Sequence, residues 1–209
     1  MAKLQVAIDL LNIDDAIALA TKVAPYIDII ELGTPLIKSE GLAGIRKMKD
    51  AFPDKLVLAD FKTADAGELE ANMAFGAGAD YITVLGATGD STIAGAVKSA
   101  KAHGKGVVVD TIGVKDRVKR AQEAIALGAE FVELHAGLDE QAEDGYSIQV
   151  LIDEATRAGV AVSIAGGVNL SSITAVKNSG VTVAVAGAAI YGAEDPAKAA
   201  KELQELAMA

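Results

Sequence analysis

The chain contains no cysteine and no tryptophan, and aromatic residues occupy only 4% of its 209 positions. The absence of thiols excludes disulfides, zinc–thiolate centres and cysteine nucleophiles, and it fits a reducing compartment. The scarcity of aromatic rings disfavours base-stacking platforms for nucleic acids. No apolar run approaches the ~20 residues that span a bilayer, and the N-terminus lacks the long apolar region of a secretory signal. We therefore expect a soluble protein of the cytoplasm.

Basic residues are also scarce. The chain has 19 Lys and Arg against 29 Asp and Glu, so its formal net charge at pH 7 is -10. Nucleic acids and anionic membranes both attract positive surfaces, and we expect neither as a partner. Hydrophobic residues make up 51% of the chain and charged residues 23%, which is typical of a globular protein with a sizeable core.

Short apolar runs rich in β-branched residues alternate along the whole chain with longer, Ala-rich amphipathic runs. Nearly continuous apolar runs are typical of parallel strands that are covered on both faces. Strands are expected at residues 4–8, 27–32, 56–59, 81–85, 106–110, 131–134, 160–164 and 183–186. Helices are expected at residues 14–23, 41–51, 66–76, 91–102, 115–127, 148–157, 170–178 and 196–207.

Eight strand–helix units predict an α/β fold, a single (β/α)8 TIM barrel over residues 1–209. The side chains of Asp90 and Asp195 are expected to cap two of the helices. Glycines that would end helices in the left-handed conformation precede four of the strands, at Gly78, Gly128, Gly159 and Gly180. A doubly wound open sheet is the alternative, but it gives no reason for eight repeats.

Chemistry in such a barrel belongs at the C-terminal ends of the strands. The polar residues at these positions are Asp9, Glu31, Asp60, Lys62, Thr83, Asp110 and His135. Strand residues two apart share a face ~6.6–6.8 Å from each other, so Asp60 and Lys62 are expected to point together into the mouth. Any one of these residues could instead cap a helix or pack in the core, and for Asp110 both roles stay open. Their recurrence at one position of successive units favours a single site.

Two glycine-rich turns follow the seventh and eighth expected strands and contain Gly166, Gly167, Gly187 and Ala188. Barrels frequently bind phosphate at this place through backbone N–H groups, and glycine lets the backbone approach the anion closely. Neither turn carries a lysine or arginine, so a phosphate would rest mainly on neutral dipoles. Either turn alone is also compatible with an ordinary tight turn, whereas the pair predicts a phosphorylated small-molecule substrate.

The run Asp60-Phe61-Lys62-Thr63-Ala64-Asp65 has the Asp-x-Lys-x-x-Asp pattern, and in this the chain resembles the orotidine 5′-monophosphate decarboxylase suprafamily. The segments at residues 4–10, 29–36, 86–92, 135–141 and 165–168 look more narrowly like its 3-hexulose-6-phosphate synthase branch. The resemblance covers residues 3 to about 203, which is nearly the whole chain.

This resemblance implies an enzyme, an aldehyde-lyase of the ribulose monophosphate pathway. It implies the Mg²⁺-dependent aldol condensation of formaldehyde with D-ribulose 5-phosphate to D-arabino-hex-3-ulose 6-phosphate through a metal-stabilised enediolate. By the same resemblance, Glu31 and Asp60 would hold Mg²⁺ or Mn²⁺, and Lys62 would stabilise the enediolate. His135 would move protons, although the sequence leaves open which proton.

Two further roles follow from the same resemblance. Asp9 would help to position the sugar. Asp65 matches the aspartate that reaches into the neighbouring subunit's site, which implies a homodimer with shared active sites. The carboxylates beside Lys62 favour its charged form, so we expect an electrostatic group rather than a Schiff-base amine.

Other functions remain in competition. The branch that decarboxylates 3-keto-L-gulonate 6-phosphate carries arginines where this chain has Leu138 and Ala188. Their loss leaves a more apolar pocket, which suits a small neutral electrophile such as formaldehyde. Orotidine 5′-monophosphate decarboxylation needs no metal and would leave Glu31 without a purpose. A non-catalytic sugar-phosphate-binding barrel would need the glycine turns but not the carboxylates, lysine and histidine on the same rim.

Overall fold

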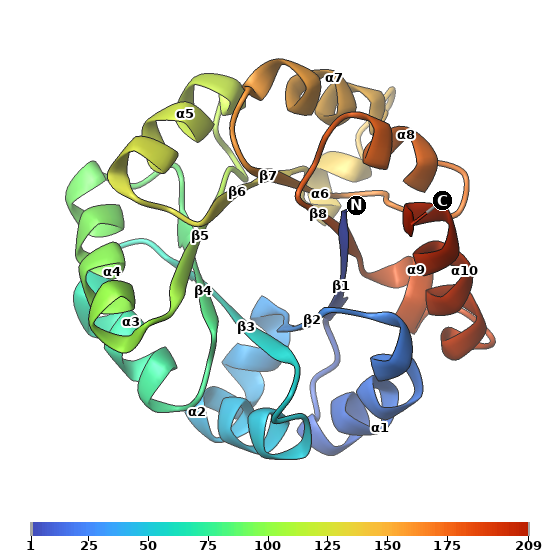
Figure 1. Ribbon diagram of the computed structural model, residues 1–209, viewed down its shortest axis with the longest axis horizontal. Coiled ribbons are helices and arrows are strands. Elements are labelled where there is room, and N and C mark those ends of the chain that lie inside the picture. Colours follow the sequence, from blue (N-terminus) through green and yellow to red (C-terminus); the bar gives the residue numbers. More distant parts are fainter. Residues whose placement is uncertain (1, 209) are drawn as a thin grey trace.

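The computed structural model describes residues 2–208 as a closed barrel of eight parallel strands, which follow one another in chain order (Figure 1). Pairing of the first strand with the last closes the barrel. The strands are β1 (Lys3–Ile8), β2 (Ile29–Leu32), β3 (Leu56–Thr63), β4 (Tyr81–Leu85), β5 (Gly106–Asp110), β6 (Phe131–His135), β7 (Val162–Ala165) and β8 (Val183–Ala186). The predicted (β/α)8 barrel is thus confirmed, and the open-sheet alternative is wrong.

Helices surround the barrel as an outer ring (Figure 1). They are α1 (Ile13–Val23), η1 (Ala24–Tyr26), α2 (Thr34–Ala51), α3 (Gly67–Gly76), α4 (Asp90–His103), α5 (Arg117–Leu127), α6 (Leu138–Gln141), α7 (Gln149–Ala158), α8 (Ile173–Asn178), α9 (Ala188–Tyr191) and α10 (Pro196–Met208). All eight predicted helices are present; η1, α6 and α9 are single turns, too short to show helical periodicity in sequence. None of the helices described combines the length and apolar character needed to cross a membrane.

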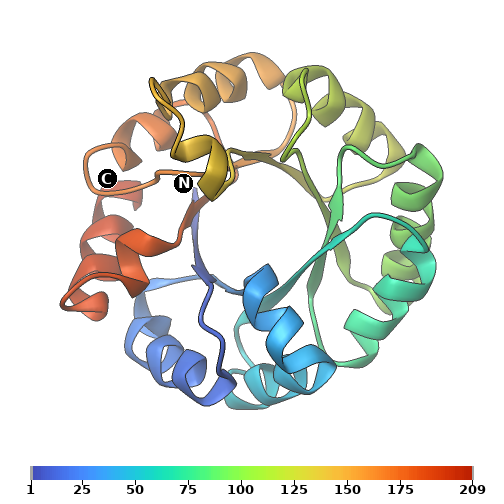
Figure 2. The same ribbon diagram turned by 180° about the vertical axis from the view of Figure 1, so that it is seen from behind.

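The largest error in the predicted helices concerns α2. It begins at Thr34 rather than at Gly41, because Pro35 has a φ already suited to a first helical turn. Gly41, with φ of 57°, interrupts the helix instead of starting it. The first part of α2 consequently lies over the inner edge of the barrel mouth, beside the polar rim (Figure 2).

Strand β3 departs from the prediction in a way that matters for the site. It continues to Thr63 beyond its expected end at Ala59, and its pairing with β4 changes register between these residues. Lys62, inside this irregular stretch, has φ of 48°. A non-glycine residue in this left-handed region costs about 1–3 kcal/mol, so the surrounding contacts must hold it there. The ends of β2 and β7 differ from the prediction by one or two residues.

The predicted turn chemistry is largely correct. All four glycines expected before strands have positive φ values, between 64° and 105°. Asp195 caps α10, since its carboxylate accepts the backbone N–H of Lys198 at 3.0 Å. The predicted cap at Asp90 is wrong: α4 already begins at Asp90, and this carboxylate binds Arg120 at 2.7 Å instead.

The interior of the barrel changes from apolar to polar along the strands. Near the N-terminal ends, the inward side chains form an apolar cluster that includes Ile29, Leu58, Val108, Phe131 and Val183. In β2 and β6 the next inward positions toward the C-terminal ends are polar and buried, at Glu31 and Glu133, and Gln5 and Ser163 are buried polar residues of neighbouring strands. Because side chains alternate across a strand, these residues share the inner face with the apolar cluster.

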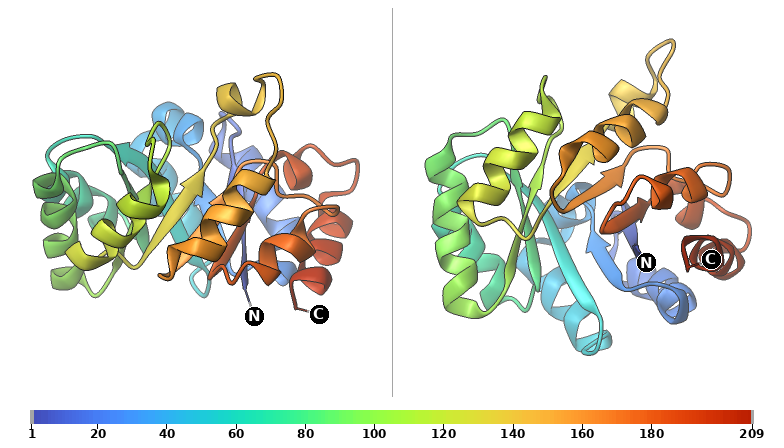
Figure 3. Two further views of the ribbon diagram at one scale, coloured as in Figure 1. Left: turned by 90° about the horizontal axis from the view of Figure 1, so that it is seen from above. Right: turned by 45° about the horizontal axis from the view of Figure 1, so that its top comes forward.

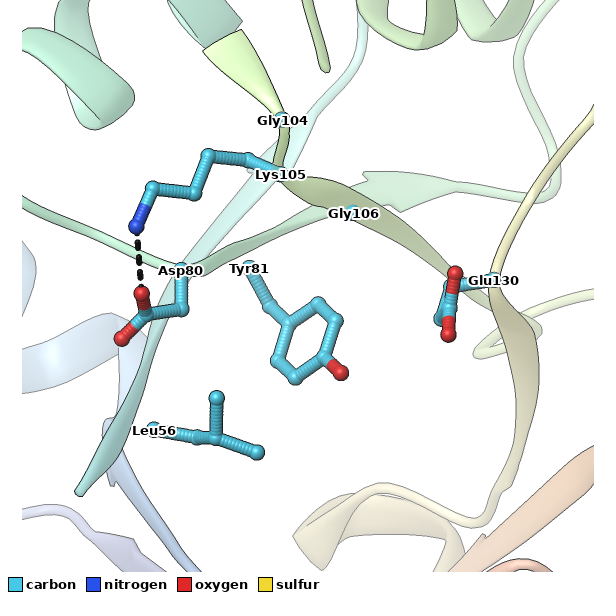
Figure 4. Close-up of a pocket in the computed structure, with 7 residues that line it drawn as sticks. All are labelled: Leu56, Asp80, Tyr81, Gly104, Lys105, Gly106 and Glu130. Atoms are coloured by element: carbon cyan, nitrogen blue, oxygen red, sulfur yellow. Dashed lines mark hydrogen bonds and ion pairs between the residues drawn. The ribbon is translucent and has the colours of Figure 1, made fainter. Parts of the chain in front are cut away.

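The N-terminal end of the barrel is closed by packing and ion pairs. Tyr81 packs edge-on against Phe131, with ring centroids 5.7 Å apart. At its margin a pocket carries Asp80, which binds Lys105 (Figure 4). Asp80 also binds Lys49. Two lysines thus compensate the charge of Asp80, in contrast to the crowded carboxylates at the opposite end.

Helices α3 and α4 approach closely enough to generate a stability prediction. A Cβ atom at Gly67 would lie 1.9 Å from the carbonyl oxygen of Thr92, so only glycine fits there. We expect Gly67→Ala to lower the free energy of unfolding by about 1–3 kcal/mol in urea titrations. Gly76→Ala, at the other end of α3, meets nothing within 4 Å and should be neutral or slightly stabilising. Equal stability of the two variants would contradict this packing.

Candidate active site

Lys62 lies at the centre of the polar rim. Its Nζ atom is 2.6 Å from Oδ2 of Asp110 and 2.9 Å from Oδ2 of Asp60, so the structure brings Asp60 and Lys62 together as predicted. Its backbone N–H donates to Oγ1 of Thr83 at 2.9 Å, which helps to hold its left-handed backbone. Burial lowers the pKa of Lys62, but the charges of Asp60, Asp110 and Glu133 outweigh burial and raise it above its ordinary value. The charged form of the side chain is therefore favoured, which suits it to stabilising an anion.

Two threonines orient the buried carboxylate of Asp60. Thr83 donates to Oδ1 at 2.6 Å, and the hydroxyl of Thr34 donates to Oδ2 at 2.6 Å. The backbone N–H of Thr34 donates to the same oxygen at 3.2 Å. Thr34 belongs to the site only because α2 begins there, and the predicted start of this helix left it out.

Asp110 links Lys62 to His135. It is completely buried, and its two oxygens lie 3.0 and 3.1 Å from Nδ1 of His135. Burial raises the pKa of Asp110, but its bonds to His135 and Lys62 have the larger effect and hold that pKa well below its usual range. An ionised Asp110 accepts the Nδ1–H of His135, which leaves Nε2 as the ring nitrogen available to other groups. Asp110 is thus part of the site and not the cap of the next helix, a role that Asp116 performs.

Two buried glutamates lie beneath this pair. Glu31 accepts a 2.7 Å hydrogen bond from Nε2 of Gln5, while one oxygen of Glu133 has no partner among the described residues. Burial raises the pKa of both glutamates well above the ordinary value, and nearby carboxylates add to the effect. For Glu31 the chief such neighbour is Asp60, and for Glu133 it is Glu31. The prediction omitted Gln5 and Glu133, although Glu133 shares the inner face of β6 with His135 by simple alternation.

Asp9 follows β1 and faces the same cluster. Burial and the charge of Asp60 raise its pKa, against the opposing charges of Lys62 and His135. Its carboxylate occupies the space beside Gly33, where a Cβ atom would lie 2.0 Å from Oδ1 of Asp9. Glycine at this position therefore makes room for the carboxylate at the rim.

The two predicted phosphate turns lie side by side, because Ala165 of β7 pairs with Val185 of β8. Gly166 and Gly167 both have positive φ values, 117° and 86°, which favour glycine at each position. Gly187 precedes the short helix α9, and Ala188 is its first residue and is exposed. The structure thus supplies accessible backbone at the place where the sequence predicted a phosphate site.

Asp65 lies apart from the other predicted residues. It is exposed, in the loop after β3, and none of the ion pairs found for residues 2–208 joins it to the Lys62 cluster. The described contacts therefore do not join Asp65 to the other predicted site residues.

The donor set at the mouth fits a divalent cation. Asp9, Glu31, Asp60, Asp110 and Glu133 converge on one lysine and one histidine, and burying uncompensated carboxylates is costly. Carboxylate oxygens are the ligands that Mg²⁺ prefers, and Glu31 has only Gln5 as a hydrogen-bond partner. Asp110, Glu133 and His135 also bring donor atoms within 4.8 Å of one another. Lys62 engages Asp60 and Asp110 alike, and His135 engages Asp110 as well, so both aspartates already have cationic partners, whereas Glu31 has none among the described residues.

Known proteins resemble this chain over nearly its whole length. Residues 2–203 match the family model described as Orotidine 5'-phosphate decarboxylase / HUMPS family. The 3-hexulose-6-phosphate synthase of Mycobacterium gastri is 63% identical over 97% of this chain and 98% of its own length. That of Methylomonas aminofaciens is 44% identical over 99% of this chain and 100% of its own.

Solved structures show the same relationship. A crystal structure of 3-hexulose-6-phosphate synthase, 63% identical, has a TM-score of 0.96 and covers 98% of this chain and 99% of its own. A crystal structure of KGPDC from Streptococcus mutans is 26% identical, with a TM-score of 0.92 over 99% of this chain and 97% of that one.

The chain therefore belongs to the orotidine 5′-phosphate decarboxylase / HUMPS family. Within this family, its resemblance to 3-hexulose-6-phosphate synthases is confirmed over nearly the full length of both chains, and it is an enzyme.

The raised pKa of Glu133 generates a test of the buried cluster. The folded protein holds this proton more tightly than the unfolded chain, so stability is lost as pH rises above the ordinary pKa of 4.5. We expect Glu133→Gln to match the wild type near pH 5 and to become the more stable protein toward pH 8. Urea titrations in EDTA at several pH values measure this difference in the free energy of unfolding, which changes by at most about 1.4 kcal/mol per pH unit.

Glu130→Gln is the matched control, because Glu130 is exposed and lies just before the same strand. Its effect on the free energy of unfolding should be small and independent of pH. A Glu133→Gln effect that does not change with pH would show that this carboxyl has no raised pKa.

Proposed function

We propose that the chain acts as a 3-hexulose-6-phosphate synthase, an aldehyde-lyase. The reaction joins formaldehyde to C1 of D-ribulose 5-phosphate and gives D-arabino-hex-3-ulose 6-phosphate. The observation that carries the proposal is the Lys62 ammonium held between Asp60 and Asp110, with His135 bound to Asp110. The 63% identity to a curated synthase over nearly the whole chain selects this reaction among those of the family.

The residues of the chain divide the chemistry among them. Removal of a C1 proton from the ketose leaves an enediolate. The base is Nε2 of His135, the ring nitrogen that is not bound to Asp110. The negative charge then lies near the fixed ammonium of Lys62, which stabilises it electrostatically. The enediolate carbon forms the new bond to formaldehyde, and the resulting alkoxide takes up a proton. Asp110 keeps the His135 ring oriented throughout, because it holds Nδ1.

We further propose Mg²⁺ as the cofactor, with Mn²⁺ as an alternative, on Glu31 and Asp60. When bound, the ion supplies a second positive charge for the oxygens of the enediolate. Thr34 and Thr83 hold Asp60 in place for this role, and Gln5 does the same for Glu31.

Decarboxylation of 3-keto-L-gulonate 6-phosphate is the second candidate, since it needs a similar anionic intermediate. The specific observation in its favour is the similarity to KGPDC from Streptococcus mutans, at 26% identity. Against it stand Leu138 and Ala188, both exposed and uncharged where the decarboxylase branch has arginines.

The first test is the consumption of formaldehyde with D-ribulose 5-phosphate and Mg²⁺. Lys62→Ala should lower kcat by at least about 10²–10³-fold, because one charge that stabilises the anion is lost. EDTA should abolish turnover, and added Mg²⁺ should restore it. Lys105→Ala, which removes an ion-paired lysine at the opposite end of the barrel, is the matched control and should retain activity.

Circular dichroism of Lys62→Ala separates loss of charge from loss of fold. Release of carbon dioxide from 3-keto-L-gulonate 6-phosphate, without consumption of formaldehyde, would move the chain to the decarboxylase branch. Full turnover in EDTA would exclude the metal, and binding of the sugar phosphate without any turnover would leave only a binding protein.

We also propose a homodimer in which Asp65 completes the partner's site. The exposure of Asp65, and the absence of an ion pair between it and Lys62 among the described residues, support this arrangement. Lys62→Ala and Asp65→Asn should each be inactive alone. After unfolding and refolding together, half of the dimers are mixed and carry one intact site, so activity should return to about a quarter of wild type. No recovery in the mixture, or an active Asp65→Asn protein, would contradict a shared site.

A further inference from the structure

The segment formed by residues 138–147, which includes α6, rises above the rim of the barrel (Figure 3). One end is held by an ion pair between Arg117 of α5 and Glu140. At the other end, the hydroxyl of Tyr146 donates a 2.7 Å hydrogen bond to the carbonyl oxygen of Gly166. This second contact joins the segment to the first glycine turn, although the two residues are 20 positions apart in the chain.

The glycine turn itself has an unusual distribution of hydrogen bonds. The carbonyl of Gly167 also accepts from side chains, from Nδ2 of Asn169 at 3.1 Å and from Oγ of Ser172 at 3.2 Å. In a trans peptide the N–H points away from the preceding C=O, so the amides of Gly167 and Val168 face away from these donors. Neither amide is a donor in the backbone hydrogen bonds found for residues 2–208.

Tyr146 also supports the turn by packing. A Cβ atom at Gly166 would lie 3.2 Å from the Tyr146 hydroxyl and 2.6 Å from the carbonyl oxygen of Ala136. A Cβ atom at Gly167 would lie 3.7 Å from the Tyr146 ring. The ring therefore packs against both glycines. It restricts a turn that would otherwise be flexible, because glycine has no side chain.

We propose that Tyr146 is a positioning residue for the substrate's phosphate, which fixes the Gly166 carbonyl and thereby presents the Gly167 amide to the anion. This inference rests on the proposed function for the identity of the ligand, D-ribulose 5-phosphate. Since the turn has no lysine or arginine, the orientation of neutral dipoles decides how well the anion binds. Tyr146 acts on binding and leaves the reacting groups Lys62 and His135 untouched.

The test is Tyr146→Phe, which keeps the ring and removes only the hydroxyl. We expect the KM for D-ribulose 5-phosphate and the inhibition constant of inorganic phosphate to rise together, by about three- to tenfold. The kcat value and the KM for formaldehyde should stay within about twofold of wild type. Tyr81→Phe is the matched control, because no side-chain hydrogen bond of Tyr81 is found among the described residues and it lies at the opposite end of the barrel.

Asn169→Ala provides a second variant that acts on the neighbouring carbonyl, and it should weaken phosphate binding in the same sense even if Tyr146→Phe folds poorly. If the inhibition constant of phosphate is unchanged in these variants, the proposal is overturned, whether or not kcat falls. Calorimetry with D-ribulose 5-phosphate or inorganic phosphate separates this outcome from a failure of the proposed function. A wild type that binds these ligands more tightly than Tyr146→Phe, yet consumes no formaldehyde, retains the role of Tyr146 and loses only the synthase assignment.

Discussion

The ammonium group of Lys62 compensates two buried carboxylates at once, and the polar interior of the barrel depends on this compensation. Without it, Asp60 and Asp110 would face each other above Glu31 and Glu133 with no fixed positive charge between them. Removing one partner of a buried ion pair typically costs about 3–5 kcal/mol. The strained backbone of Lys62 and the register change in β3 are therefore maintained by the same charges that make the site reactive.

The barrel separates stability from chemistry along its axis. Its N-terminal half is packed with Ile29, Phe131 and other apolar side chains, and Asp80 there is compensated by two lysines. The interior also contains polar atoms that have no partner among the described residues, at Gln5, Glu133 and Ser163. Such atoms are costly in a core but are ready to meet a ligand or ion, and the apolar half provides the stability that permits them.

The sequence predicts the barrel well because its signals are local. Apolar periodicity, and glycines such as Gly128 before strands, each act within a few residues. The rim is predictable for the same reason, since Asp60, Asp110 and His135 all end or follow strands. The positive φ of Lys62 and the bond from Tyr146 to Gly166 are not predictable in this way, because they depend on contacts between segments distant in sequence. Thr34 was missed because a helix start over the mouth has no signature of its own beyond Pro35.

The glycine turns after β7 and β8 would determine how phosphate binding responds to pH and ionic strength. Backbone amides neither titrate nor release counterions. The electrostatic potential that they present to a bound phosphate therefore does not change with pH and depends only weakly on ionic strength. If the turns bind the phosphate of the proposed substrate, its recognition would follow the ionisation of that phosphate, near pH 6, rather than that of any side chain in the turns. For a chain with a net charge of -10, such an arrangement would bring an anion to the rim without a basic patch that would also attract polyanions.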